Sequence, residues 1–169
     1  MNRDLYIDGR YFFTMFTKDR IPFFQHYDFC ELFMRGVEVI KNAIDFDLDA
    51  YCILPDHVHL LITLPDGMRN YSDLIVPLRF GVTRFFEKYV DMPIRTVWQE
   101  KYLVHTIQDP HDAQTHFDFI HYNPVHHGYV NNIDYWPWSS IDLESDNRDI
   151  KTRLSEINKL SQSGCMFAE

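Results

Sequence analysis

Hydrophobic and polar residues follow regular patterns over most of the chain, and these patterns predict four strands and three helices. Residues 10–17 are rich in aromatic and β-branched side chains and follow an Asp-Gly turn, which predicts a strand. Apolar residues between positions 29 and 40 then recur at helical spacing, with Asp28 as the predicted N-cap. Residues 46–54 alternate, and a second apolar segment spans 58–64, which together predict an antiparallel hairpin.

The rest of the pattern completes one mixed domain. Helical spacing resumes over residues 71–89, where Pro77 and Gly81 are expected to kink the helix. A fourth strand is predicted at 102–107, and a third helix starts at Asp109-Pro110 and runs towards His121. The order βαββαβ plus a helix favours a ferredoxin-like α+β fold, an antiparallel sheet with helices on one face.

The end of the chain is expected to form an accessory segment. We assign residues 1–140 to the domain and 141–169 to a C-terminal tail. Apolar residues at 150, 154 and 157 in this tail have helical spacing. They predict either a short helix docked on the domain or a frayed end.

Composition is that of a soluble globular protein, with 46% hydrophobic and 24% charged residues. No apolar run approaches the roughly 20 residues needed to span a membrane, and the first residues lack the apolar core of a secretory signal. We therefore expect a cytoplasmic protein. Cys30, Cys52 and Cys165 are odd in number and far apart, which predicts reduced thiols, two of them buried.

The net charge of −9 argues against indiscriminate wrapping of nucleic acid but permits a local basic groove. Arg84 and Lys88 lie at i and i+4 on the second predicted helix and would share a face. Solvated surface charges are the commoner explanation for such residues. The candidate contacts to a DNA backbone are Arg3, Arg10, Arg79, Arg84, Lys88, Arg95 and Lys101.

Two histidines on one predicted strand are the first candidate for chemistry. In a strand, residues i and i+2 point to the same face, so His57 and His59 would present two imidazoles side by side. A pair of surface histidines is the ordinary explanation for an isolated His-x-His. Asn123, in or just beyond the last turn of the third helix because Pro124 follows it, could add an amide oxygen and complete a metal site.

These residues stand within a longer set of motifs that resembles a known family. The motifs are Tyr-Phe-Phe-Thr at 11–14, Leu-Pro-Asp-His-Val-His at 54–59, Trp-Gln at 98–99, His105, and Phe-Ile-His-Tyr-Asn-Pro-Val-His-His-Gly at 119–128. Their order and spacing resemble the REP-associated tyrosine transposases, single-tyrosine members of the HUH endonuclease class. The resemblance covers about residues 5–138.

The resemblance implies cleavage and rejoining of single-stranded DNA at palindromic REP-like hairpins. In such enzymes two histidines and a later polar residue, here His57, His59 and Asn123, bind Mg²⁺ or Mn²⁺. A tyrosine on a helix attacks the scissile phosphate and forms a 5′-phosphotyrosine intermediate. The expected partner is thus single-stranded or hairpin DNA in a bacterial, nucleoid-associated setting, with no membrane. The resemblance implies a monomer, although related single-tyrosine transposases form dimers.

One position departs from the family pattern. The tyrosine four residues before the asparagine is replaced by Phe119, which has no hydroxyl and cannot attack phosphorus. The chain is therefore expected to bind DNA and metal without forming the covalent intermediate. The intact flanking motif favours a deliberate substitution over natural loss of cleavage, and one sequence leaves both open. Tyr122 is a weaker substitute nucleophile, because it lies about 60° around the helix from position 119, on the side away from Asn123.

The other residues near the motif have ordinary explanations that we prefer. His121 and His127 could donate a proton to the leaving 3′ oxygen, but histidines near a helix C-terminus also serve as caps. Asp56 could orient His57, although it fits a turn as well. Trp98, Trp136 and Trp138 are expected to pack in the core or at its rim.

Two other functions compete with cleavage through a tyrosine. One is a non-catalytic hairpin-binding protein in which Phe119 is native. The other is a metallohydrolase that uses His57, His59 and a further histidine to activate water.

Overall fold

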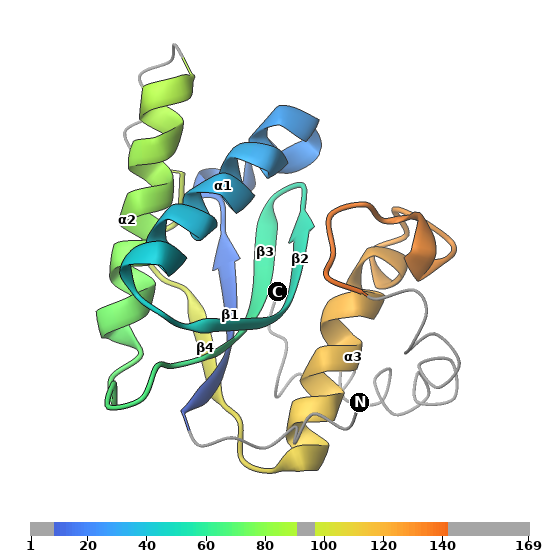
Figure 1. The fold of residues 1–169 in the computed structure, drawn as a ribbon. Coiled ribbons are helices and arrows are strands. Elements are labelled where there is room, and N and C mark those ends of the chain that lie inside the picture. The colour runs from blue at the N-terminus through green and yellow to red at the C-terminus, as the bar shows by residue number, and fades with distance from the viewer. Residues whose placement is uncertain (1–8, 91–96, 142–169) are drawn as a thin grey trace.

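The computed structural model describes residues 9–90 and 97–141, and these form a single antiparallel sheet with three helices (Figure 1). The elements are β1 (Arg10–Phe16), α1 (Tyr27–Ala43), β2 (Asp47–Leu54), β3 (His57–Thr63), α2 (Ser72–Tyr89), β4 (Leu103–Thr106) and α3 (Pro110–His126), with short 3₁₀ turns at Lys18–Arg20, Phe23–Gln25 and Ile133–Tyr135. The strand order is β2-β3-β1-β4, with every neighbouring pair antiparallel. This confirms the predicted ferredoxin-like α+β fold.

The helices divide between the two faces of the sheet (Figure 1). α1 and α2 pack on the face that carries Phe13 and Leu60, whereas α3 packs on the opposite face, against Phe12 and Leu61. The expectation of helices on one face therefore holds for α1 and α2 only. The physical reason is that β3 is buried along its whole length, so both of its faces need cover.

Glycine allows α1 and α2 to approach closely. A Cβ atom on Gly81 would lie 2.9 Å from Cγ1 of Ile40, closer than real Cβ atoms come to their neighbours. Gly81 thus serves helix packing, and α2 continues through both it and Pro77. α1 begins at Tyr27, with His26 at the cap, so Asp28 lies inside the first turn and is not the N-cap that was predicted. A carboxylate in this turn is still favoured by the helix dipole.

Residues after α3 return to the open edge of the sheet. The N–H of Ile53 donates to the carbonyl of Trp138 at 2.8 Å, and the N–H of Ser140 donates to the carbonyl of Tyr51 at 3.0 Å. This pairing covers part of β2, an edge strand that would otherwise expose unpaired backbone groups.

Several smaller expectations can also be compared with the structure. Cys30 and Cys52 are buried free thiols, as predicted, and burial raises the pKa of Cys30 to about 12. Trp98 is buried in the core below α1 and α2. Cys165 and the predicted tail at 142–169 lie outside the described residues. Among the described helices, none has the length and apolar character to cross a membrane.

Candidate metal centre and nucleic-acid site

β3 places the two imidazoles of the His-x-His motif side by side on the face that α3 covers. The side chains of His57 and His59 are 0% and 1% exposed, and their ring centroids are 4.9 Å apart. Strand periodicity explains this arrangement, because the intervening Val58 points into the opposite core. The pair is therefore a buried feature of the sheet and not a surface pair.

Each imidazole is held by a neighbour through Nδ1. The Asp56 carboxylate lies 2.7 Å from Nδ1 of His57, and Nε of Arg20 donates to the same carboxylate at 2.9 Å. The hydrogen bond with His57 lowers the pKa of Asp56 below its ordinary value. Nδ1 of His59 lies 2.9 Å from Oγ1 of Thr14, which faces it across the β1–β3 pair. These contacts fix both rings and make Nε2 the nitrogen that would bind a metal.

The structure gives Asp56 the weaker of its two expected roles and gives Thr14 a role that the sequence did not assign. For Asp56 the turn was the preferred explanation and orientation of His57 the alternative, and its carboxylate contacts His57. Thr14 was part of the quoted motif without a role of its own. Its contact with His59 depends on strand register, which local sequence spacing does not give.

α3 brings two further positions to the histidine pair. Asn123 lies in the last turn of α3 and is fully buried, and its side chain interacts with the His59 imidazole. The Phe119 ring, 2% exposed, lies 5.2 Å from the His59 ring in an edge-on arrangement. The i, i+4 spacing puts both side chains on the helix face that meets β3.

This set of side chains fits a divalent cation. Burial lowers the pKa of His59 well below its ordinary value, with His57 and His127 adding to the effect, so His59 is neutral, as a metal ligand must be. A buried amide oxygen next to the His59 imidazole suits a hard cation. His57, His59 and Asn123 are accordingly the residues that would hold the metal.

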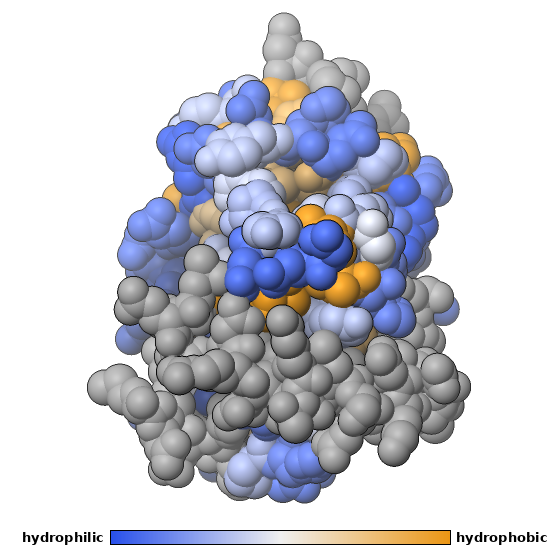
Figure 2. Space-filling model, turned by 90° about the vertical axis from the view of Figure 1, so that its right-hand side faces the viewer, coloured by the Kyte–Doolittle hydropathy of each residue, from blue (hydrophilic) through white to orange (hydrophobic). Residues whose placement is uncertain are grey.

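A series of aromatic rings leads from His57 to the surface, and the sequence did not predict it. His127 caps α3, and its ring centroid lies 5.1 Å from that of His57. The Tyr129 ring stacks on His127 at 5.8 Å and on Trp136 at 5.5 Å, and Tyr129 is 45% exposed. Figure 2 views the molecule from the side on which α3 lies and shows mainly hydrophilic residues where the described surface is visible.

His121 does not join this arrangement. It lies about 200° around the helix from Phe119. Its Nδ1 is 2.8 Å from the carbonyl of Phe117, and its Nε2 is 2.9 Å from Oγ of Ser140. Burial lowers its pKa to about 4. These contacts tie α3 to the returning segment, so the structure corrects the expectation of a proton donor at this position.

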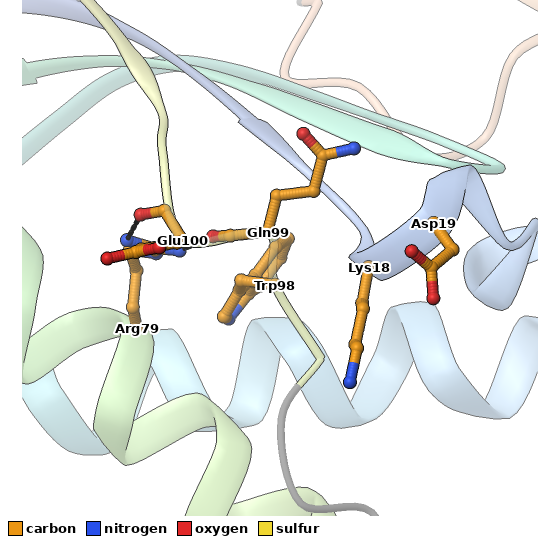
Figure 3. Close-up of a pocket in the computed structure, with 6 residues that line it drawn as sticks. All are labelled: Lys18, Asp19, Arg79, Trp98, Gln99 and Glu100. Atoms are coloured by element: carbon orange, nitrogen blue, oxygen red, sulfur yellow. Dashed lines mark hydrogen bonds between the residues drawn. The ribbon is translucent and has the colours of Figure 1, made fainter.

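Two of the predicted DNA-backbone contacts are engaged within the protein. Arg10 is 3% exposed, and its Nε donates to the Asp49 carboxylate at 3.1 Å and to Oγ1 of Thr63 at 3.0 Å, which corrects its assignment as a DNA contact. Arg79 donates to the backbone carbonyls of Gln99 and Glu100. It borders a pocket of about 620 Å³ whose other lining residues are Lys18, Asp19, Trp98, Gln99 and Glu100 (Figure 3).

Two of the remaining basic candidates lie on α2, away from the histidine pair. Arg84 forms an ion pair with Glu87 at 3.0 Å, and Lys88 lies over the Tyr89 ring. Both are on α2, behind the sheet as seen from α3 (Figure 1). Lys101 is exposed before β4. Arg3 and Arg95 lie outside the described residues.

Comparisons with known proteins agree with the resemblance noted in the sequence. Residues 6–123 match the family model described as IS200-like transposase. A Haemophilus influenzae protein assigned to the REP-associated tyrosine transposases is 35% identical over 163 residues, covering 90% of this chain and 88% of the relative. The REP-associated tyrosine transposase of Escherichia coli is 27% identical over 150 residues, covering 89% and 84%.

Solved structures give the same picture of the fold. A REP-associated tyrosine transposase bound to a REP hairpin matches with a TM-score of 0.73 and 26% identity, over 89% of this chain and 88% of that one. A candidate transposase from Deinococcus radiodurans matches with a TM-score of 0.52 and 21% identity, over 68% and 90%, which shows the fold alone.

Proposed function

This chain belongs to the IS200-like transposase family and, within it, to the REP-associated tyrosine transposases, and we propose that its site serves metal-dependent cleavage and rejoining of single-stranded DNA at REP-like hairpins. One observation carries the proposal: two oriented imidazoles, a buried amide and the nucleophile position of the family meet between β3 and α3. The residues are His57, His59, Asn123 and Phe119.

The chemistry follows from these residue types. A divalent cation such as Mg²⁺ or Mn²⁺, held by His57, His59 and Asn123, would polarise the scissile phosphate and neutralise charge that develops on it. Position 119 is where a tyrosine would attack and store the bond as a 5′-phosphotyrosine. Phe119 has no hydroxyl, so this chain binds its substrate and does not form that link. His127, next to His57, is the better placed of the two histidines for donating a proton to the leaving 3′ oxygen.

Hairpin DNA is the proposed partner. The solved relative at 26% identity is bound to a REP hairpin. The net charge of −9 requires that contacts be local, because general attraction to phosphate is weak. We propose a monomer in the cytoplasm, associated with the nucleoid.

The test is a binding measurement on the chain as it stands. Fluorescence anisotropy compares a labelled hairpin carrying a single-stranded flank with a fully paired duplex of the same base composition. We expect at least about tenfold tighter binding to the hairpin, which corresponds to about 1.4 kcal/mol. Equal affinity for the two DNAs, or a preference for the duplex, would contradict the proposal.

Two features favour particular alternatives. Phe119 favours a non-catalytic hairpin binder, which would bind in the same assay and remain inert when tyrosine is restored. His127 gives the site a third imidazole and so favours a metallohydrolase that activates water. Metal-dependent cleavage by the Phe119 chain, without a covalent protein–DNA product, would support this second alternative.

A further inference from the structure

A second group of metal-binding side chains lies where β4 meets the start of α3. His105 is on β4, and Asp112 and His116 stand at i and i+4 on α3, so they share a helix face. One ligand atom from each of the three lies within 4.8 Å of the other two. This group contains none of the residues proposed for the DNA-cleavage site.

The three side chains are already oriented towards one another. Nε2 of His105 is 2.9 Å from Oδ2 of Asp112, and Nδ1 of His116 is 2.9 Å from Oδ1 of the same carboxylate. The two imidazoles stack with centroids 4.5 Å apart and planes 16° apart. Nδ1 of His116 also lies 2.9 Å from the backbone carbonyl of Asp112, a contact that an ion bound to this nitrogen would replace.

The surrounding structure holds the carboxylate and leaves one side open to solvent. Oδ2 of Asp112 accepts a hydrogen bond from the backbone N–H of Gln108 at 2.8 Å. His116 is fully buried against Phe12, with ring centroids 4.8 Å apart. The side chain of His105 is 35% exposed, so an ion could enter there and keep water in its remaining positions.

Charge also favours a cation at this point. The ion pairs of Asp112 within the described part of the chain are with His105 and His116. A divalent ion would bring a fixed positive charge to this carboxylate. Two imidazole nitrogens and one carboxylate oxygen are a ligand set typical of Zn²⁺.

We propose that His105, Asp112 and His116 form a second metal site, which binds a Zn²⁺-like cation and clamps the start of α3 to β4. The clamp has a consequence for the first site, because α3 also carries positions 119 and 123. A bound ion would hold this helix in place against the sheet while leaving the ligands of the first site unchanged.

Metal stoichiometry tests the proposal on the full chain, with any affinity tag removed and bound metal stripped by a chelator. The protein is dialysed against Zn²⁺, and its metal content is measured by elemental analysis. The variants His105→Ala and Asp112→Asn each remove one ligand, and His111→Ala removes an exposed histidine of the same helix turn as the matched control. Far-UV circular dichroism establishes that each variant is folded.

We expect both ligand variants to lose one equivalent of Zn²⁺ relative to the wild type, and His111→Ala to lose none. Zn²⁺ should also raise the thermal midpoint of the wild type by more than that of His105→Ala. Equal zinc content in the wild type and His105→Ala would overturn the proposal, as would a wild type that binds no zinc. Neither result bears on hairpin binding, so this site and the proposed function fail separately.

Discussion

The role of Arg10 gives a sharp test, because sequence and structure assign it opposite functions. The sequence suggests a contact to DNA phosphate, whereas the structure buries Arg10 against Asp49 and Thr63. The variant Arg10→Met keeps most of the apolar stem of the side chain and removes its charge. The control is Arg84→Met, which removes an arginine whose side chain is 67% exposed in its pair with Glu87.

The two substitutions should differ strongly in their effect on stability. Removing one partner of a buried ion pair costs about 3–5 kcal/mol, because the other charge stays buried. Asp49 is 14% exposed and also accepts a hydrogen bond from Thr63, so we expect the lower end of this range, about 3 kcal/mol, for Arg10→Met. The exposed pair of Arg84 is worth at most about 1 kcal/mol.

Urea unfolding measures the stability, and anisotropy with the hairpin measures DNA binding under conditions in which both variants are folded. Arg10→Met should bind the hairpin within about twofold of the wild type. Adding Asp49→Leu should recover at least half of the lost stability, because the uncompensated charge is removed. The reasoning fails if Arg10→Met unfolds at the same urea concentration as the control and weakens hairpin binding instead.

Three further substitutions test other contacts of the site. Asp56→Asn should weaken Mn²⁺ binding by about 10- to 100-fold in titration calorimetry, because it loosens the imidazole of His57, a proposed metal ligand. Asp66→Asn, in an exposed turn, is the control. An Mn²⁺ affinity of Asp56→Asn equal to that of the wild type would contradict this role. Tyr129→Ala should lose about 1–3 kcal/mol of binding free energy for single-stranded DNA if bases stack on this ring. Tyr129→Phe keeps the ring and should bind like the wild type. Equal losses of binding free energy in the two variants would refute stacking. Burial lowers the pKa of His121 to about 4 in the folded protein, from 6.5 in an exposed histidine. The contribution of His121 to stability is therefore complete above pH 6.5 and is lost as the pH falls towards 4. From pH 7 to pH 5 the wild type should therefore lose about 2 kcal/mol more than His121→Gln in urea unfolding, and equal losses would show that His121 is not buried in its neutral form.

Local periodicity was enough to predict the two elements that carry the site. The period of two in a strand placed His57 and His59 on one face, and the helical i, i+4 relation placed position 119 with Asn123. Pro110 at the first position of α3 and the two strands of the hairpin were predicted for equally local reasons. These features depend on neighbours within one element, which the sequence shows directly.

The contacts that the sequence did not predict join segments that lie far apart in the chain. Arg10 meets Asp49 because a β-bulge between Leu48 and Ala50 inserts an extra residue into β2, and residue spacing gives no sign of that bulge. The approach of His127 to His57 requires α3 to cross the second face of the sheet. A pattern of apolar residues shows that a helix has a buried side, but it does not show which face of the sheet that side covers.

Restoring tyrosine at position 119 tests the central claim most directly. The variant Phe119→Tyr and the unchanged chain are incubated with labelled hairpin DNA and Mn²⁺, and the products are separated on a denaturing gel. The control is the double variant that combines Phe119→Tyr with His57→Ala. We predict a covalent protein–DNA adduct for Phe119→Tyr alone, and only in the presence of the metal. An intact hairpin in every lane, although Phe119→Tyr is folded and binds the DNA, would contradict the assignment of position 119 and of the metal centre beside it.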